Sequence, residues 1–551
     1  MKRKCWSVSS DIMKERFHAL AGLALCGALL LHRVADTRAG ETNSTVTAPN
    51  ASVAPLWGRL LAGPYLVGFE RVFRFDASRT WHVTRHFAGN YAPDQHGRPV
   101  QLNIWYPSSS GATGGAMKFS DYEQQAAPEE FSTFNVLMNG RNRLSAESSV
   151  PSSQLEALRT AQMNARLNEP PAVGRFPVVL YAGGLNADIN SNFVLAEYLA
   201  SHGYVVASIS LVGPTDETPS LDRAPSDVET VVRDLEFALG LLAERENVDR
   251  TRVAVMGHSL GAVEAAALGL RHGNVLAVVA LDGTYGFKGS AEVLTNSYGY
   301  APNRMRAAFL DLRRAQGEQD ADLDLGPIFS FRYADRTLVQ IRHMHHSDFT
   351  SFAMIASRFN VPIKTNYVNT GWNRETARRG FEDMCGIVLG FLETKVKTNA
   401  PAANSQEETV LQNSGIVWKH IEAQCAPPGP RESLALARKS GIGGLEAVLE
   451  KCAGDQPPGS CVDSGLFNTF GYQLLGQGRV NDALTIFETA AWAHPASANA
   501  QDSLADALFA AGEDKRARAA VQRAIELAPT DPTIQDAARE SFIAEEKRRL
   551  P

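Results

Sequence analysis

Short apolar runs alternate with segments of helical periodicity through the middle of the chain. Strand-like runs and helical segments follow one another in the order 176–181, 193–202, 204–209, 227–246, 253–256, 261–270 and 275–281. Two neighbouring parallel strands need a crossover of about a dozen residues or more between them, and a helix supplies it. The alternation therefore predicts right-handed β–α–β units and a mostly parallel sheet flanked by helices.

Further strands and a helix are expected on either side of this region. Residues 100–106 alternate apolar and polar side chains and stop at a proline, which is typical of a strand. Runs at 328–333 and 337–341 predict the last two strands, and the periodicity at 374–393 predicts a closing helix.

A long polar connection interrupts the strand series at 108–172. It is irregular with helical stretches, and so long a connection inside a compact domain favours a lid over a pocket. We therefore expect one α/β domain over 80–395 that carries an insertion at 108–172.

The first 39 residues have the layout of an export signal. Five basic residues precede an apolar run at 19–31, and small residues follow near position 39. The run is shorter than the roughly 20 residues that cross a bilayer, so a cleaved signal peptide at 1–39 is expected, with an uncleaved anchor as the alternative. The start of 40–79 is rich in Thr, Ser, Ala and Pro, which predicts a flexible leader. The mature protein is expected to be exported, without a stable membrane span.

The charge balance argues against nucleic acid as a partner. Among the 551 residues, Lys plus Arg number 54 and Asp plus Glu number 60, and no dense basic run lies beyond the first few residues. Nucleic-acid binding needs a basic face, so no nucleic-acid partner is expected.

Signal cleavage would leave four cysteines, Cys385, Cys425, Cys452 and Cys461. Four cysteines in an exported chain can pair in three ways. Cys452 and Cys461 enclose a short Gly/Pro-rich stretch, which favours that pair, and free buried thiols are the alternative. No CxxC or Cys/His spacing predicts a zinc site.

The C-terminal part of the chain repeats itself after a linker expected at 396–432. Apolar and small residues of 464–497 recur in 498–531 with an offset of 34 residues. That period and pattern resemble the tetratricopeptide repeat, in which each unit is a pair of antiparallel helices. An all-α tetratricopeptide domain is expected over 433–551, and because stacked helical pairs form concave surfaces, it predicts a possible protein partner.

A GxSxG pattern, Gly257-His258-Ser259-Leu260-Gly261, follows the strand-like run at 253–256 and precedes a helical segment. This context is that of a nucleophile elbow, a strained turn from strand to helix that lifts a serine hydroxyl above the sheet. Glycines are needed there because neighbouring backbone comes too close for side chains. Ser259 is therefore the expected nucleophile, and a structural Gly-rich turn is the alternative.

A serine hydroxyl needs a base that takes its proton and an acid that orients the base. Asp282 ends one predicted strand and Asp335 follows another, and both positions suit the acid. The base is expected after the final strand, where His346 is the first choice and His345 the second. His343 completes that cluster, but a metal site is not expected because no HExxH-type helix or carboxylate accompanies the three histidines.

Acyl chemistry also needs hydrogen-bond donors aimed at the developing oxyanion. The backbone N–H of Leu260, just after the nucleophile, is one expected donor. The loop Gly183-Gly184-Leu185 follows an earlier strand, and the Leu185 N–H is the other; an ordinary tight turn is the alternative for this loop.

Several motifs taken together resemble the plasma, or type II, platelet-activating-factor acetylhydrolases, which are lipase-like α/β hydrolases. They are Ile104-Trp105-Tyr106-Pro107, the Gly184-Leu185 loop, the segment 199–206, the GxSxG pattern and Ala280-Leu281-Asp282-Gly283. The resemblance covers about residues 80–395. It implies that Asp282 rather than Asp335 is the acid, and that the base lies just before Asp348-Phe349, at His345 or His346.

The resemblance further implies esterase or lipase-like activity on short or oxidised acyl esters, with neither metal nor cofactor. Two positions depart from the family pattern: Gly183 stands where a histidine is usual, and 210–213 lack the Arg-Asp pair often found there. A phospholipid substrate therefore does not carry over with the motifs. The repeat domain has no counterpart in the mammalian enzymes and looks like modules appended to exported bacterial hydrolases.

These observations predict an exported serine hydrolase with an α/β-hydrolase fold and a C-terminal tetratricopeptide domain. It would cleave the carboxylic ester bond of a small ester or a lipid. The reaction would use Ser259, His346 and Asp282 and pass through an acyl-enzyme. The alternative is a catalytically inert hydrolase fold whose repeats recruit a partner. Acyl transfer to an acceptor other than water would use the same residues.

Overall fold

The computed structural model describes residues 56–82, 84–85, 91–92, 96–109, 115–124, 126–315, 323–362, 371–398 and 416–550. The predicted signal peptide at 1–39 and the start of the predicted leader lie outside these residues. Among the residues described, no helix combines the length and the apolar character that crossing a membrane requires.

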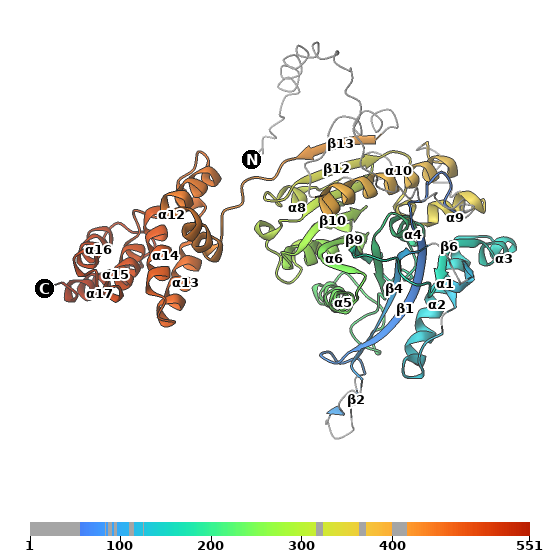
Figure 1. The fold of residues 1–551 in the computed structure, drawn as a ribbon, viewed down its shortest axis with the longest axis horizontal. Coiled ribbons are helices and arrows are strands. Elements are labelled where there is room, and N and C mark those ends of the chain that lie inside the picture. Colours follow the sequence, from blue (N-terminus) through green and yellow to red (C-terminus); the bar gives the residue numbers. More distant parts are fainter. Residues whose placement is uncertain are drawn as a thin grey trace, which may run out of the picture. The chain divides into compact units, whose positions relative to one another are not determined.

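An eleven-stranded sheet forms the centre of the N-terminal part, with strand order β13-β12-β11-β10-β9-β7-β8-β4-β1-β6-β5 (Figure 1). The strands are β1 (Leu66–Asp76), β4 (Arg98–Ser108), β5 (Ala116–Lys118), β6 (Gln162–Leu167), β7 (Phe176–Ala182), β8 (Val205–Ile209), β9 (Val248–His258), β10 (Val275–Leu281), β11 (Ala308–Arg314), β12 (Arg336–Ile341) and β13 (Ile416–Ile421). From β8 through β12 all neighbours are parallel. The mostly parallel sheet with flanking helices confirms the predicted α/β-hydrolase fold.

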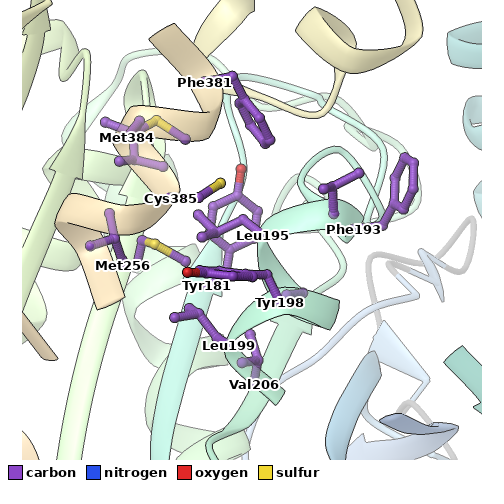
Figure 2. Close-up of a cluster of buried hydrophobic side chains, with 14 of the residues drawn as sticks. Tyr181, Phe193, Leu195, Tyr198, Leu199, Val206, Met256, Phe381, Met384 and Cys385 are labelled. Carbon is purple, nitrogen blue, oxygen red and sulfur yellow. The ribbon is translucent and has the colours of Figure 1, made fainter. Parts of the chain in front are cut away.

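Helices cover both faces of the sheet because its strands are apolar on both sides. The helices that do so are α4 (Phe193–Ser201), α5 (Pro225–Ala243), α6 (Leu260–Arg271) and α10 (Arg374–Leu392). Alternate residues of a strand point to opposite faces: Val179 and Tyr181 of β7 belong to the core shared with α4 and α10, whereas Val178 and Leu180 belong to the core shared with α5 and α6. Figure 2 shows the first core, where Tyr181 packs among side chains of α4 and α10.

Two strands of the sheet lie outside the predicted domain boundaries. Residues 66–76, expected in a flexible leader at 40–79, form β1, which pairs antiparallel with β4 along its whole length. Residues 416–421, expected in the linker at 396–432, form β13 and pair antiparallel with β12. The folded domain therefore extends beyond 80–395 at both ends, because β1 pairs within the sheet with β4 and β6, and β13 forms one edge of the sheet.

The strand predicted at 328–333 is wrong. Its first two residues lie in the short helix α8 (Gly326–Phe329), where Pro327 occupies the first turn, a position that suits a proline. The strand that pairs with β12 at this place in the sheet is instead β11. The sequence pattern does not predict β11, because Asp311 and Arg313 interrupt its apolar run. Their side chains are buried and form an ion pair with each other, which compensates part of the cost of burying both charges.

The insertion at 108–172 is more regular than expected. It contains β5, α1 (Ser120–Glu123), α2 (Ser132–Ser149), α3 (Leu155–Arg159) and β6. β6 pairs with β1 and β5 pairs with β6, so the insertion extends the central sheet. The helix α2 is thereby attached to a framework of strands.

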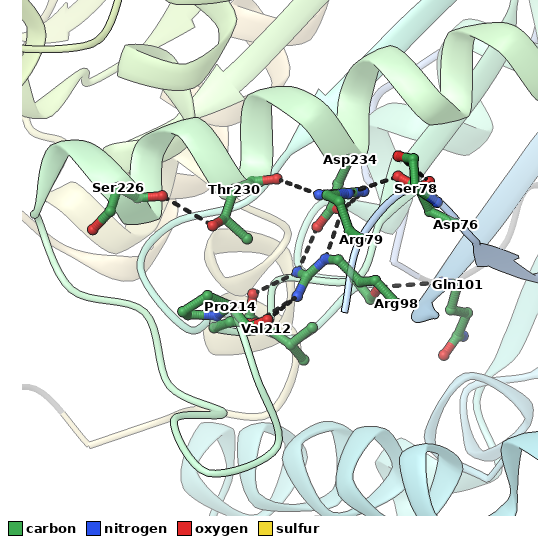
Figure 3. A network of polar contacts seen from close by, with 12 residues as sticks. Asp76, Ser78, Arg79, Arg98, Gln101, Val212, Pro214, Ser226, Thr230 and Asp234 are labelled. Atoms are coloured by element: carbon green, nitrogen blue, oxygen red, sulfur yellow. Dashed lines mark hydrogen bonds and ion pairs between the residues drawn. The ribbon is translucent and has the colours of Figure 1, made fainter. Parts of the chain in front are cut away.

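A buried polar network holds the segment after β8 (Figure 3). Arg98, at the start of β4, donates to both carboxylate oxygens of Asp234 on α5, at 2.8 and 2.7 Å. The same guanidinium donates to the carbonyl oxygens of Val212 and Gly213. Arg79 also pairs with Asp234 at 2.6 Å. Each buried charge in this network thus has an opposite charge beside it.

The C-terminal part is helical, as predicted. Its helices are α12 (Pro430–Ala453), α13 (Ser464–Gly476), α14 (Val480–Ala493), α15 (Ala498–Ala510), α16 (Asp514–Leu527) and α17 (Asp536–Arg548). The pairs α13–α14 and α15–α16 coincide with the two predicted repeats. A Cβ atom on Gly471 would lie 2.4 Å from the ring of Phe487, so glycine at this position lets α13 and α14 pack closely.

The disulfide joins Cys425 to Cys452, so the favoured pairing of Cys452 with Cys461 is wrong. The sulfur of Cys461 is free. A straight helix of the 24 residues of α12 would be about 36 Å long, yet the Cα atoms of Cys425 and Cys452 are 4.9 Å apart. The chain reverses at Gly441, whose φ of 76° breaks the helix, and this reversal brings the two cysteines together.

Candidate active site

The GxSxG pattern forms a sharp turn between β9 and α6. Ser259 stands between them with φ 57° and ψ −116°, a strained conformation for a residue with a side chain. A Cβ on Gly257 would lie 1.9 Å from the carbonyl oxygen of Gly261, and one on Gly261 would lie 2.1 Å from that of Ala182. Both glycines are therefore required by the close approach of backbone, and the turn has the geometry expected of a nucleophile elbow.

The structure brings Ser259, His346 and Asp282 together in one chain of hydrogen bonds. Ser259 Oγ lies 2.8 Å from His346 Nε2, and His346 Nδ1 lies 2.6 Å from Asp282 Oδ2. Asp282 follows β10 with φ 46°, and His346 begins a 3-10 turn, His346–Phe349, after β12. Since β9, β10 and β12 are parallel, their carboxyl ends lie at one edge of the sheet, and the three side chains meet there.

Asp282 is an anion in a fully buried position. Burial by itself raises the pKa of its carboxyl, but the hydrogen bond and charge of His346, together with the charges of Arg314 and Arg313, bring that pKa below its ordinary value. Arg314 Nε lies 3.5 Å from Asp282 Oδ2. The carboxylate is therefore suited to accept the Nδ1 proton of His346 and fix the orientation of the ring.

The alternative acid and bases lie elsewhere. Asp335 precedes β12, where it pairs with Lys395 at 3.0 Å and accepts a hydrogen bond from the Ala423 N–H. His345 is buried, and its ring packs 5.2 Å from that of Trp372. His343 lies beside Gly371. None of these three bonds to Ser259 in the part of the chain described.

Two residues next to the site, His258 and Thr284, were not predicted from the sequence. His258 is buried and its Nε2 donates to the carbonyl oxygen of His346 at 2.9 Å, which holds the backbone of that residue. Burial and the nearby His346 lower the pKa of His258 to about 3, so its ring is neutral. Thr284 Oγ1 lies 3.4 Å from Ser259 Oγ. His258 occupies a variable position of the GxSxG pattern, which is why the pattern says nothing of its role.

The loop expected to supply an oxyanion donor lies against the elbow. A Cβ on Gly184 would be 3.4 Å from the Cβ of Ser259 and 3.2 Å from His258 Nδ1, so the next residue, Leu185, is close to the nucleophile. Leu260 is the first residue of α6, where backbone N–H groups have no acceptor within the helix. The two N–H groups chosen from the sequence therefore belong to segments that meet at Ser259.

A cavity of about 790 Å³ opens beside the nucleophile. Ser259, His346 and Leu185 line it on one side, and α2 of the insertion lines it on another. This volume lies within the usual range of about 300 to 1,000 Å³ for small-molecule sites. Among the residues described, no cluster of three or more His, Cys, Asp or Glu side chains has an arrangement that could hold a metal ion.

The fold is that of the α/β hydrolases, and a helical repeat domain follows it. Residues 135–308 match the family model described as chlorophyllase, and residues 474–540 match that of the tetratricopeptide repeat. The chain thus contains a segment similar to the chlorophyllase family within its α/β-hydrolase fold, and a segment similar to the tetratricopeptide repeat. The match to the first model includes Ser259 and Asp282 but ends before His346.

Curated relatives and a solved structure are similar over parts of the chain. "Chlorophyllase-1, chloroplastic" of Citrus sinensis and its counterpart of Citrus unshiu are each 34% identical over 116 residues, which are 20% of this chain and 34% of theirs. The chain thus spans about a third of the length of these relatives. A ferulic acid esterase from Streptomyces cinnamoneus is 18% identical, with a TM-score of 0.46 over 68% of this chain and 98% of that one.

Proposed function

We propose that this protein is a serine hydrolase that cleaves carboxylic esters. The observation that carries the proposal is the hydrogen-bonded chain from Ser259 through His346 to Asp282, at a strained turn that faces a cavity. A serine is a weak nucleophile unless a base is placed in this way. The similarity to chlorophyllases supports the same reaction class.

In the proposed reaction Ser259 Oγ attacks the ester carbonyl while its proton passes to His346 Nε2. The N–H groups of Leu185 and Leu260 stabilise the negative charge on the carbonyl oxygen, and Asp282 stabilises the imidazolium. The bond to the alkoxy oxygen then breaks, and His346 gives its proton to the departing alcohol. Water attacks the acyl-enzyme with His346 as base, which releases the carboxylic acid and restores the Ser259 hydroxyl.

We further propose that the mature protein is exported and that its substrates are small esters or lipid esters. The Cys425–Cys452 disulfide supports export, because such bonds persist in oxidising compartments. The motifs shared with platelet-activating-factor acetylhydrolases favour short or oxidised acyl groups. The repeat domain is proposed to bind a protein partner, in line with its match to the tetratricopeptide model.

Replacement of the nucleophile tests the proposal directly. Ser259→Ala is expected to lower kcat for 4-nitrophenyl butyrate by roughly 10⁶-fold without unfolding the chain. It should also abolish labelling by a fluorophosphonate. The control is Ser226→Ala, which changes an exposed serine at the start of α5 and should leave both readouts as in the wild type. Wild-type protein that neither labels nor turns over esters would favour the inert, partner-recruiting alternative.

A further inference from the structure

Arg141 is a cation on the wall of the cavity that contains Ser259. It lies on α2 of the insertion and is the only arginine or lysine among the described residues that line this cavity. Its guanidinium donates to the carbonyl oxygens of Leu211 and Pro219, the second at 2.7 Å. A guanidinium has five N–H donors, so these two bonds leave three for another ligand.

Among the residues that the structure describes, Arg141 differs from neighbouring arginines in having no acidic partner. On the same insertion Arg143 pairs with Glu147 at 3.8 Å, and Arg159 pairs with Glu123 at 2.9 Å. Arg98, which binds the same segment after β8, pairs with Asp234. Within the described parts of the chain, no carboxylate oxygen comes within 4.0 Å of the Arg141 guanidinium.

This unbalanced charge is partly buried. Its burial lowers the pKa of Arg141, and no neighbouring charge offsets that effect. A partly desolvated cation attracts an anion more strongly than an exposed one does. Arginine also binds carboxylates and phosphates with two parallel hydrogen bonds. The wall of the cavity thus presents an anion-binding group that no acidic side chain in the described part of the chain occupies.

The two acidic side chains that line the same cavity do not supply this anion. Glu123 is paired with Arg159. Asp188 accepts hydrogen bonds from Ser145 Oγ at 2.7 Å and from the Asn190 N–H at 2.8 Å, and burial raises the pKa of its carboxyl. Both acids therefore have partners other than Arg141.

We propose that Arg141 binds a negatively charged group of the substrate, so that the preferred substrates are esters bearing a carboxylate or phosphate away from the scissile bond. This inference rests on the proposed function, since the ester carbonyl must reach Ser259 in the same cavity. The anion could belong to the acyl part or to the alcohol part of the ester, and the experiment separates the two.

The test compares each charged ester with a neutral counterpart. The acyl arm uses 4-nitrophenyl monoesters of adipic, suberic and sebacic acid, each beside the ester of the corresponding monoamide. The alcohol arm uses dihexanoylglycerol phosphate beside dihexanoylglycerol. In at least one arm the wild type should prefer the anionic ester in kcat/KM by roughly tenfold to a hundredfold, the range for a hydrogen bond to a charged group. This preference should fall as salt is added.

Variants of α2 distinguish charge recognition from a structural role. Arg141→Gln is expected to abolish the preference for the anionic ester, and Arg141→Lys to retain part of it. Arg143→Gln, the matched control on the exposed side of the same helix, should keep the wild-type preference. If Arg141 only tied α2 to the carbonyls of Leu211 and Pro219, Arg141→Gln would lower kcat/KM for both members of each pair alike.

Three outcomes would overturn the inference. They are equal kcat/KM values for the charged and neutral esters of the wild type, a preference that persists in Arg141→Gln, and a parallel loss on both members of a pair. The failure of the proposed function has a different signature, because the wild type would then hydrolyse none of these esters and would not react with a fluorophosphonate.

Discussion

Replacement of Asp282 by asparagine probes the part of the site that depends most on charge. Asp282 Oδ2 accepts the Nδ1 proton of His346 at 2.6 Å, which leaves the Nε2 lone pair directed at Ser259. An asparagine amide that donates at this position would reverse the roles of the two ring nitrogens. The proton would then lie on Nε2, and His346 could not accept the proton of Ser259.

The expected loss follows from two estimates. Removing the orienting carboxylate of a Ser-His-Asp triad costs roughly 10⁴-fold in kcat, which is about 5 kcal/mol at 1.36 kcal/mol per decade. The attraction between carboxylate and imidazolium, with charges about 4 Å apart and an effective dielectric constant of about 20, is about 4 kcal/mol. The two values agree, so most of the loss is electrostatic stabilisation of the imidazolium and control of its tautomer.

The assay is kcat for 4-nitrophenyl butyrate, with thermal unfolding and near-UV circular dichroism to show that the variant is folded. Asp335→Asn is the matched control, because this aspartate was the alternative acid and bonds to Lys395 and Ala423 instead. It should keep wild-type kcat. A folded Asp282→Asn that lost less than about a hundredfold, or an equal loss in Asp335→Asn, would refute the reasoning.

Two further predictions concern stability. Cys425→Ser should lower the unfolding free energy of the C-terminal helices by about 3.5 kcal/mol, the chain-entropy value for a closed loop of 27 residues. Hydrogen exchange along a urea series measures this free energy, with Cys461→Ser as the control. Equal stability of the two variants would contradict the prediction. Burial raises the pKa of Asp348 to about 6 from 3.8. The folded state therefore binds this proton more tightly than the unfolded state does, and the contribution of Asp348 to the unfolding free energy falls as pH rises from about 4 to about 6. The unfolding free energy of Asp348→Asn, measured across this pH range, should not show that decrease. Identical pH profiles for the variant and the wild type would contradict the prediction.

The features that the sequence predicted are those set by local pattern. Short continuous apolar runs predicted the parallel strands, because a strand buried on both faces needs apolar side chains on both sides. The helical periodicity between these runs predicted the helices that connect them. The glycines around Ser259 identified the elbow, because close backbone contacts exclude side chains at 257 and 261. Two copies of a period of 34 residues predicted the paired helices at the C-terminus.

The features that were missed depend on contacts distant in the chain. β1 pairs with β4 and β6 inside the sheet, and β13 is an edge strand that pairs with β12, so both strands are defined by distant partners. A strand without a central apolar run has little local signal. β11 was missed because the Asp311–Arg313 pair makes a buried segment look polar. The Cys425–Cys452 disulfide was missed because the chain reverses direction at Gly441, and the spacing between cysteines does not reveal that reversal.

The choice between His345 and His346 could not come from composition or position, because adjacent residues point in different directions. In the structure His346 faces Ser259, while His345 packs against Trp372. That difference is fixed by the 3-10 turn, in which the backbone N–H of His345 donates to Asp348 at 2.8 Å. A one-residue shift of this turn would exchange the two rings and separate base from nucleophile.

The attachment of the insertion bears on how the cavity selects its ligand. Glu197 on α4 is buried and accepts hydrogen bonds from Trp57 Nε1 and Tyr122 Oη, both at 2.8 Å. It also accepts from the backbone N–H groups of Asn164 and Ala165 on β6, both at 3.3 Å. One carboxylate thereby joins α1 and β6 of the insertion to a helix of the core. Because α2 lies between these two anchored elements, Arg141 is positioned by the sheet rather than by a free loop, and a fixed cation discriminates charge without an ordering cost at binding.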